Sequence, residues 1–149
     1  MNGFIKTFND SVILTAMIGW FVAQFLKVIF VCIKHKKLDF RRFIGSGGMP
    51  SSHSSTVMAL STAIGLIEVF SSSIYAVCLV LALIVMYDAA GVRRAAGQQA
   101  KILNKIVEEW GKASYSDTEK KLKELLGHTP VEVLAGAILG IVIALIRHI

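Results

Sequence analysis

The chain has 149 residues, of which 54% are hydrophobic and 17% charged, and its mean hydropathy is +0.63. An ordinary soluble domain is less apolar and more charged, so this composition indicates a membrane protein. At about 20 residues per span, the chain could hold about four spans, which leaves little room for a separate soluble domain. We therefore predict one membrane-embedded domain over residues 1–149.

Four apolar stretches predict an all-helical, polytopic membrane bundle. They cover residues 11–33, 54–70, 74–90 and 131–146. The first stretch is too long for the core of a signal peptide and no small-residue cleavage site follows it, so we expect a retained span. The second and fourth are short, which is typical of segments that tilt little or begin inside a protein-lined cavity.

Basic residues indicate how the spans are oriented. Five follow the first span, namely Lys34, Lys36, Lys37, Arg41 and Arg42. Five more follow the third span, namely Arg93, Arg94, Lys101, Lys105 and Lys112. The link between the second and third spans carries only Glu68, so we expect both basic loops in the cytoplasm and the protein in the cell membrane. These loops beside anionic lipids explain the net charge of +6 without a nucleic-acid partner.

The linker after the third span contains a helical pattern. Between residues 98 and 110 the apolar positions share one helical face, at Ile102, Leu103, Ile106, Val107 and Trp110. This spacing predicts an amphipathic helix on the membrane surface, and residues 117–126 predict a second, short helix. Cys32 and Cys78 both lie in apolar stretches, so we interpret them as buried hydrophobic residues and expect no disulfide.

Polar groups gather at the cytoplasmic ends of four segments, which indicates a site. The basic side chains among them are Lys27, Lys34, Arg93 and Arg94. A helix start with free N–H groups is expected at Gly47, Gly48, Ser51 and Ser52. Cations and a helix N-terminus together predict a phosphate pocket. Lys27 carries most of this argument, because an ionisable group inside a span is costly, although its ammonium could instead reach the interface.

Two histidines complete the predicted site. His53 follows the glycine and serine turn, and His128 precedes Thr129 and Pro130, the expected N-cap and first residue of the last span. Glu132 is four residues beyond His128, close enough to fix the imidazole tautomer and to support a positive charge on it. A histidine held in this way can attack phosphorus while a second histidine protonates the departing oxygen. Capping or interfacial roles are the alternative for each histidine taken alone.

Three sequence stretches resemble a known family. They read G-G-M-P-S-S-H (47–53), V-M-Y-D-A-A-G-V-R-R (85–94) and L-G-H-T-P-V-E-V (126–133). They are similar to the divergent branch of the type 2 phosphatidic acid phosphatase superfamily, which also contains acid phosphatases and vanadium haloperoxidases. The resemblance implies that His53 is the acid toward the leaving group, that His128 is the nucleophile, and that Glu132 replaces the family's aspartate.

The resemblance also implies which residues hold phosphate: Ser51, Ser52, Lys27, Lys34, and Arg93 or Arg94. Ser52 stands where the motif has glycine, and Lys34 with His35 stands where it has arginine and proline. A long insertion separates Arg94 from His128 where the family has five residues. A lysine offers a point charge where arginine offers a bidentate fork, so the phosphate contacts are altered.

We therefore predict a membrane-embedded lipid phosphatase that works through a phosphohistidine at the cytoplasmic face, without cofactor or metal. Asp88 is expected to pair with a nearby cation, and a metal site with Glu132 is the alternative. A non-catalytic phosphate- or phospholipid-binding carrier is the second hypothesis, and a purely structural membrane protein is the third. Small residues in the last span, Ala135, Gly136 and Gly140, could pack within the chain or in a homo-oligomer.

Overall fold

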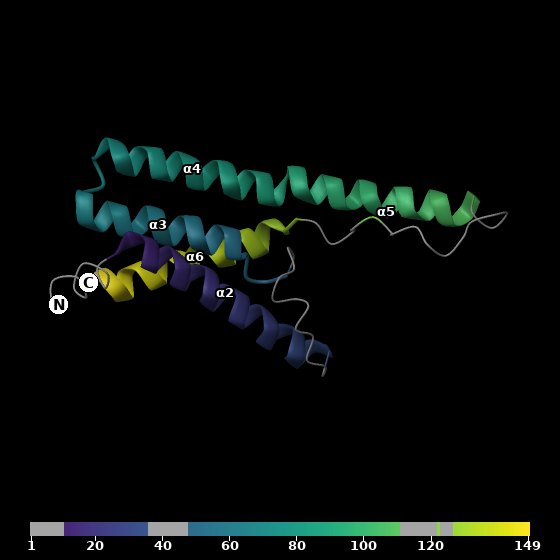
Figure 1. The fold of residues 1–149 in the computed structure, drawn as a ribbon, viewed down its shortest axis with the longest axis horizontal. Helices are drawn as coiled ribbons and strands as arrows, with labels where there is room; N and C mark the ends of the chain where they lie inside the picture. Colours follow the sequence, from purple (N-terminus) through teal and green to yellow (C-terminus); the bar gives the residue numbers. More distant parts are fainter. Residues whose placement is uncertain (1–10, 36–47, 111–121, 123–126) are drawn as a thin grey trace.

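The computed structural model describes residues 11–35, 48–110, 122 and 127–149. Its helices are α2 (Val12–His35), α3 (Ser52–Glu68), α4 (Ser73–Ala90), α5 (Val92–Trp110) and α6 (Pro130–His148). Figure 1 shows α2, α3 and α6 packed together, α4 alongside α3, and α5 continuing past the end of this bundle. The elements are all helices within the described ranges, which confirms the predicted polytopic helical bundle.

Helices long and apolar enough to cross a membrane cover three of the four predicted spans. They lie at Val12–Ile33, Ser73–Glu109 and Pro130–His148, among the residues that the structure describes. Large apolar side chains on these helices are exposed, including Ile13, Val77 and Ile146. Such an exposed apolar surface is expected where helices face lipid rather than water.

The predicted second span forms α3, which packs against α2, α4 and α6 in the centre of the bundle. Its 17 residues extend about 25 Å, less than the hydrocarbon core of about 30 Å. The buried residues of α3 are all small, and they are Ser52, Ser54, Ser55, Ala59, Ser61, Thr62, Ala63 and Gly65. Because other helices surround it, α3 can carry hydroxyl groups that lipid would not tolerate.

Small residues allow α2, α3 and α6 to approach closely. A methyl group at Gly136 or Gly140 of α6 would overlap the carbonyl oxygens of Ser51 and Ser55 in α3. Between α2 and α3, the Ser55 hydroxyl donates a hydrogen bond to the Gly19 carbonyl oxygen at 2.9 Å. The glycines predicted to form a packing face on α6 therefore pack within the chain.

The amphipathic helix in the linker after the third span is confirmed as α5. It begins at Val92, six residues earlier than predicted, and follows α4 with only Gly91 between them. Ile102 and Leu103 of its apolar face are exposed, and its contact with a membrane surface stays a prediction. The short helix predicted at 117–126 lies outside the described residues. Both cysteines are free, but they are half-buried rather than buried as expected.

At the end of the bundle remote from residues 48–53, side chains fasten α2 to α6. The Thr15 hydroxyl lies 2.9 Å from Nε2 of His148 and accepts a hydrogen bond from Nε of Arg147 at 3.2 Å. These contacts fix the relative position of the two outer helices. The polar cluster described next lies at the opposite end, where α3 and α6 begin.

Candidate active site

The starts of α3 and α6 are joined to each other. Ser51 is the N-cap of α3, and its backbone N–H donates to the Glu132 carbonyl oxygen in the first turn of α6 at 2.9 Å. Thr129 is the N-cap of α6 and forms a reciprocal capping box with Glu132, as the T-P-V-E sequence predicts. Two helix N-termini, each with a partial positive charge, therefore lie at one place.

The loop before α6 is held by the junction between α4 and α5. The backbone N–H of His128 donates to the Ala89 carbonyl oxygen at 2.9 Å. Gly127 has a φ of +90°, and a methyl group there would overlap the backbone of Arg93 and Arg94. Glycine is thus required at 127 both by its conformation and by this close approach. These contacts place His128 beside the C-terminal end of α4.

The His128 side chain is buried, with 1% of its surface exposed, and Glu132 orients it. Nδ1 of the imidazole lies 3.3 Å from Oε2 of Glu132, which also accepts the Thr129 backbone N–H at 3.0 Å. A carboxylate can only accept, so Nδ1 carries the proton in this contact. In the neutral ring this leaves a lone pair on Nε2, which makes no hydrogen bond of good geometry with any described residue.

The protonation of His128 differs from the sequence-based expectation. Burial lowers the pKa of the ring below the ordinary histidine value, and the positive charge of Lys27 lowers it further. The hydrogen bond and negative charge of Glu132, with the nearby Gly48 backbone, raise the pKa by less. Glu132 thus supports the protonated form as predicted, but the balance favours a neutral imidazole. A neutral ring with a lone pair on Nε2 is the form that attacks phosphorus.

His53 and Lys27 lie beside this imidazole. The ring centroids of His53 and His128 are 6.0 Å apart in an edge-to-face arrangement. Lys27 is 1% exposed, and its charge acts on both rings. Nζ of Lys27 and Nδ1 of His53 are buried without a hydrogen-bond partner among the described residues. The alternative that Lys27 reaches the interface is therefore wrong, because its ammonium is enclosed.

Gly48 makes room for Lys27. Its φ is +95°, and a methyl group at this position would lie 3.3 Å from Cγ of Lys27. Pro50 precedes the N-cap Ser51, because α3 begins at Ser52. Gly48 thus lets the loop pass close over the lysine stem.

The predicted phosphate-binding serines are both buried at this helix start. The Ser51 hydroxyl accepts the Ser54 backbone N–H at 3.3 Å and the Ser54 hydroxyl at 3.0 Å, so it caps the helix. The Ser52 carbonyl oxygen accepts from Thr56 at 2.7 Å. Their direct contact with phosphate stays a prediction. The side chain of Lys34, two turns beyond Lys27, lies outside the described part of the chain.

The two arginines take different places. Nε of Arg93 pairs with Oδ2 of Asp88 at 2.5 Å, which confirms the predicted structural pairing of this aspartate. The charges of Arg93 and Asp88 both act on His53, so the pair lies at the edge of the histidine cluster. Arg94 is exposed, and its backbone rather than its side chain is fixed by Gly127. Arg93 is the arginine that the structure places nearer the site.

Comparison with known proteins identifies the family of the chain. A model of the Divergent PAP2 family matches residues 8–143, which include every residue of the site described above. The chain belongs to this family. It is also 42% identical over 144 residues to the uncharacterized membrane protein YuiD of Bacillus subtilis, covering 90% of this chain and 91% of that protein. No solved structure matches the chain.

Two residues that hold the site together were missed by sequence reasoning. Gly48 was expected only as part of the helix start that binds phosphate, and Gly127 entered only as part of the L-G-H-T-P-V-E-V stretch. Both instead adopt positive φ beside a functional side chain, Lys27 in one case and His128 in the other. The signal that could have identified Gly127 is its position directly before a candidate catalytic histidine.

Proposed function

We propose that the chain hydrolyses a phosphate monoester or diphosphate of a lipid through a phosphohistidine on His128. The observation that supports this most is a group of buried nitrogen atoms, Nε2 of His128, Nδ1 of His53 and Nζ of Lys27, without partners among the described residues. Leaving a buried polar atom unpaired costs about 1–3 kcal/mol, so a purely structural cluster would be expected to pair them. A phosphate group would supply oxygen acceptors for Lys27 and for protonated His53, and its phosphorus would face the Nε2 lone pair of His128.

In the first step, Nε2 of His128 attacks phosphorus. The new P–N bond forms as the P–O bond to the lipid alcohol breaks, and protonated His53 gives its proton to the departing oxygen. Glu132 holds the Nδ1 proton of His128 and stabilises the positive charge that develops on the ring. The products of this step are the free lipid alcohol and phosphohistidine.

In the second step, water attacks the phosphohistidine. His53, now neutral, accepts a proton from the water, and the P–N bond breaks with its electron pair returning to Nε2. Phosphate leaves, and the two histidines regain their starting states. The Lys27 ammonium and the Arg93 guanidinium stabilise the negative charge on the phosphoryl oxygens in both steps.

A lipid substrate is favoured by the position of the site. It lies at the ends of membrane-spanning helices, where headgroups of a bilayer would lie. The basic residues that follow the first and third spans in the sequence favour the cytoplasmic face of the cell membrane. Phosphatidate, phosphatidylglycerol phosphate and prenyl phosphates all fit this description.

A phosphate- or phospholipid-binding carrier is the second candidate. The pairing of Arg93 with Asp88 favours it, because a guanidinium already bound to a carboxylate is less able to stabilise a phosphoryl transition state. Such a carrier would use Lys27 and the two helix N-termini for binding, and it would not need the Nε2 lone pair of His128.

The test is phosphate release by the purified protein in detergent, over a panel of phosphorylated lipids, with a chelator present. His128→Ala should abolish release while the lipid still binds, and Lys27→Met should weaken binding itself. His148→Ala, at the far end of α6, is the matched control and should retain activity. Release that persists in His128→Ala would refute the phosphohistidine, and binding without release in the unmodified protein would favour the carrier.

A further inference from the structure

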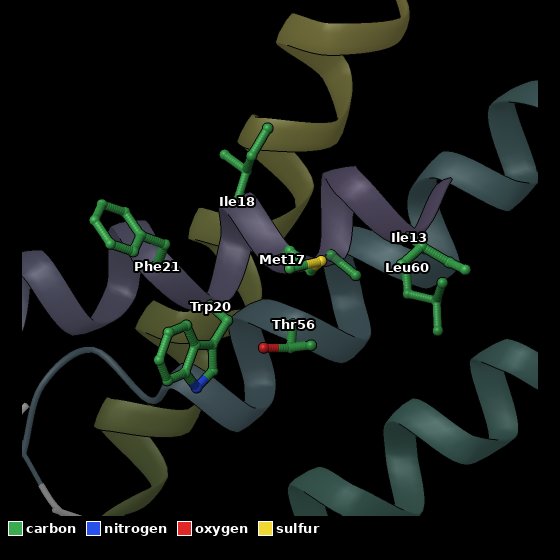
Figure 2. A pocket seen from close by; sticks show the side chains of 8 residues that line it. Ile13, Met17, Ile18, Trp20, Phe21, Thr56 and Leu60 are labelled. Atoms are coloured by element: carbon green, nitrogen blue, oxygen red, sulfur yellow. The ribbon is translucent and has the colours of Figure 1, made fainter. Parts of the chain in front are cut away.

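A cavity of about 670 Å³ lies between α2 and α3, and the proposed phosphate chemistry does not use it. Figure 2 shows side chains from both helices around it. Its lining includes Ile13, Met17, Trp20, Phe21, Thr56 and Leu60. The volume falls in the range of sites for small organic ligands, about 300–1,000 Å³. The cavity is large enough to accept a ligand. It is also much larger than the small voids left by ordinary packing in a protein interior.

The lining of this cavity is apolar throughout. Thr56 is the only residue with a hydroxyl group among those that line it, and that hydroxyl donates to the Ser52 carbonyl oxygen at 2.7 Å. Thr56 therefore has its polar atom already bonded to the backbone of α3. A wall of this kind offers nothing to a headgroup and favours hydrocarbon.

The cavity and the phosphate site follow one another along the same pair of helices. Thr56 is three residues after His53, one turn deeper along α3, and Trp20 is seven residues before Lys27, two turns deeper along α2. Three- and seven-residue separations keep side chains on one face of a helix. The Ser55–Gly19 hydrogen bond shows that these two stretches of α2 and α3 lie at one level.

A lipid phosphate has a polar headgroup followed by an apolar chain, the same order as the phosphate site and the cavity along α2 and α3. Its headgroup lies at the membrane interface and its chains extend toward the middle of the bilayer. The distance from Lys27 to Phe21 along α2 is about 9 Å, so a phosphate held at Lys27 would place the first part of a chain at the opening of the cavity.

We propose that the cavity between α2 and α3 binds the hydrocarbon chain of the lipid whose phosphate occupies the Lys27 and histidine site. This inference rests on the phosphate site proposed above and adds a selection for long-chain substrates. The cavity binds the hydrocarbon chain of the lipid, and the phosphate headgroup is positioned for attack by His128. A short phosphate ester would bind through its phosphate group only, because it has no chain to fill the cavity.

The first test measures binding without turnover. Trp20 and Trp110 are the two tryptophans of the chain, so Trp110→Phe leaves Trp20 as the single fluorophore in the cavity. In mixed micelles, phosphatidate with brominated chains should quench Trp20 more strongly than phosphatidylcholine with the same chains at equal mole fraction. Equal quenching by the two lipids would make the cavity an ordinary lipid-facing surface. No quenching by either would mean that protein covers it.

The second test measures turnover against chain length. For soluble alkyl phosphates, kcat/KM should rise about fourfold per added methylene until the cavity is full, the equivalent of ~0.8 kcal/mol per buried CH₂. Met17→Trp, which adds bulk to the cavity, should lower the ratio of long-chain to short-chain kcat/KM. Val77→Trp, an exposed position on α4, is the matched control and should leave that ratio unchanged.

The two tests separate failure of this inference from failure of the proposed enzyme. Phosphate release that is independent of chain length, with quenching independent of headgroup, would refute the chain-binding cavity and leave the phosphatase in place. Headgroup-selective quenching without phosphate release from any lipid would support the cavity and refute the phosphatase.

Discussion

Replacing Lys27 by methionine should stabilise the protein and weaken its function. Nζ of Lys27 is enclosed and has no hydrogen-bond partner among the described residues, while its stem packs against Gly48. Methionine keeps a stem of similar length and removes the buried ammonium. An unsatisfied buried polar group costs about 1–3 kcal/mol, so the free energy of unfolding should rise by about this amount.

The effect on ligand binding should have the opposite sign. A hydrogen bond to a charged group contributes about 1.5–3 kcal/mol, which corresponds to a loss of roughly 10- to 150-fold in affinity for a phosphorylated lipid. A residue that lowers stability and raises affinity is typical of a functional site, whereas a structural residue would contribute to stability alone.

The assay pairs thermal unfolding of the detergent-solubilised protein with lipid binding and phosphate release. Lys101→Met is the matched control, because Lys101 is exposed on α5 and its substitution should change the unfolding free energy by less than about 0.5 kcal/mol. A Lys27→Met protein that unfolds at a lower temperature than the unmodified protein would refute the reasoning. So would one that binds and hydrolyses lipid phosphates as before.

Three further predictions concern the histidine and the helix packing. The mechanism needs a neutral His128, whose pKa is lowered by burial, so the acid-side decline of kcat/KM in a pH–rate profile should lie below 6.5, and Glu132→Gln should move this decline to lower pH. An upward move would contradict the assigned contact. Gly127→Ala should strongly lower the rate of phosphate release while changing the melting temperature little, because it displaces the His128 loop from the start of α5. An unchanged kcat would count against this. Gly140→Val should destabilise the bundle by about 1–3 kcal/mol, since its side chain would overlap the Ser55 carbonyl oxygen, as chemical or thermal unfolding would show.

Local spacing in the sequence predicted the contacts around His128 correctly. The four-residue separation of His128 and Glu132 predicted their contact, and the T-P-V-E pattern predicted the cap of α6. Lys27 was identified because a charge within an apolar run is unusual wherever the run folds. These features depend on residues within one or two helical turns of each other.

Features that depend on distant segments were not predictable. Hydropathy identified residues 54–70 as apolar, but it could not show that α3 is enclosed by α2, α4 and α6. The contact of Gly127 with the start of α5 joins segments more than 30 residues apart, so no local pattern records it. The sequence left the cation that pairs with Asp88 unnamed, because only tertiary structure decides which cation lies nearest.

The central position of α3 has a consequence for biogenesis. Nascent chains emerge from the ribosome N-terminus first, so α3 is synthesised well before α6, the helix whose glycines pack against its backbone. Until then the hydroxyl-bearing side of α3 that α6 later covers has to be shielded by the insertion machinery. This side of α3 is therefore covered by α6 only after translation reaches the last helix, and His53 and His128 are brought together at that final step.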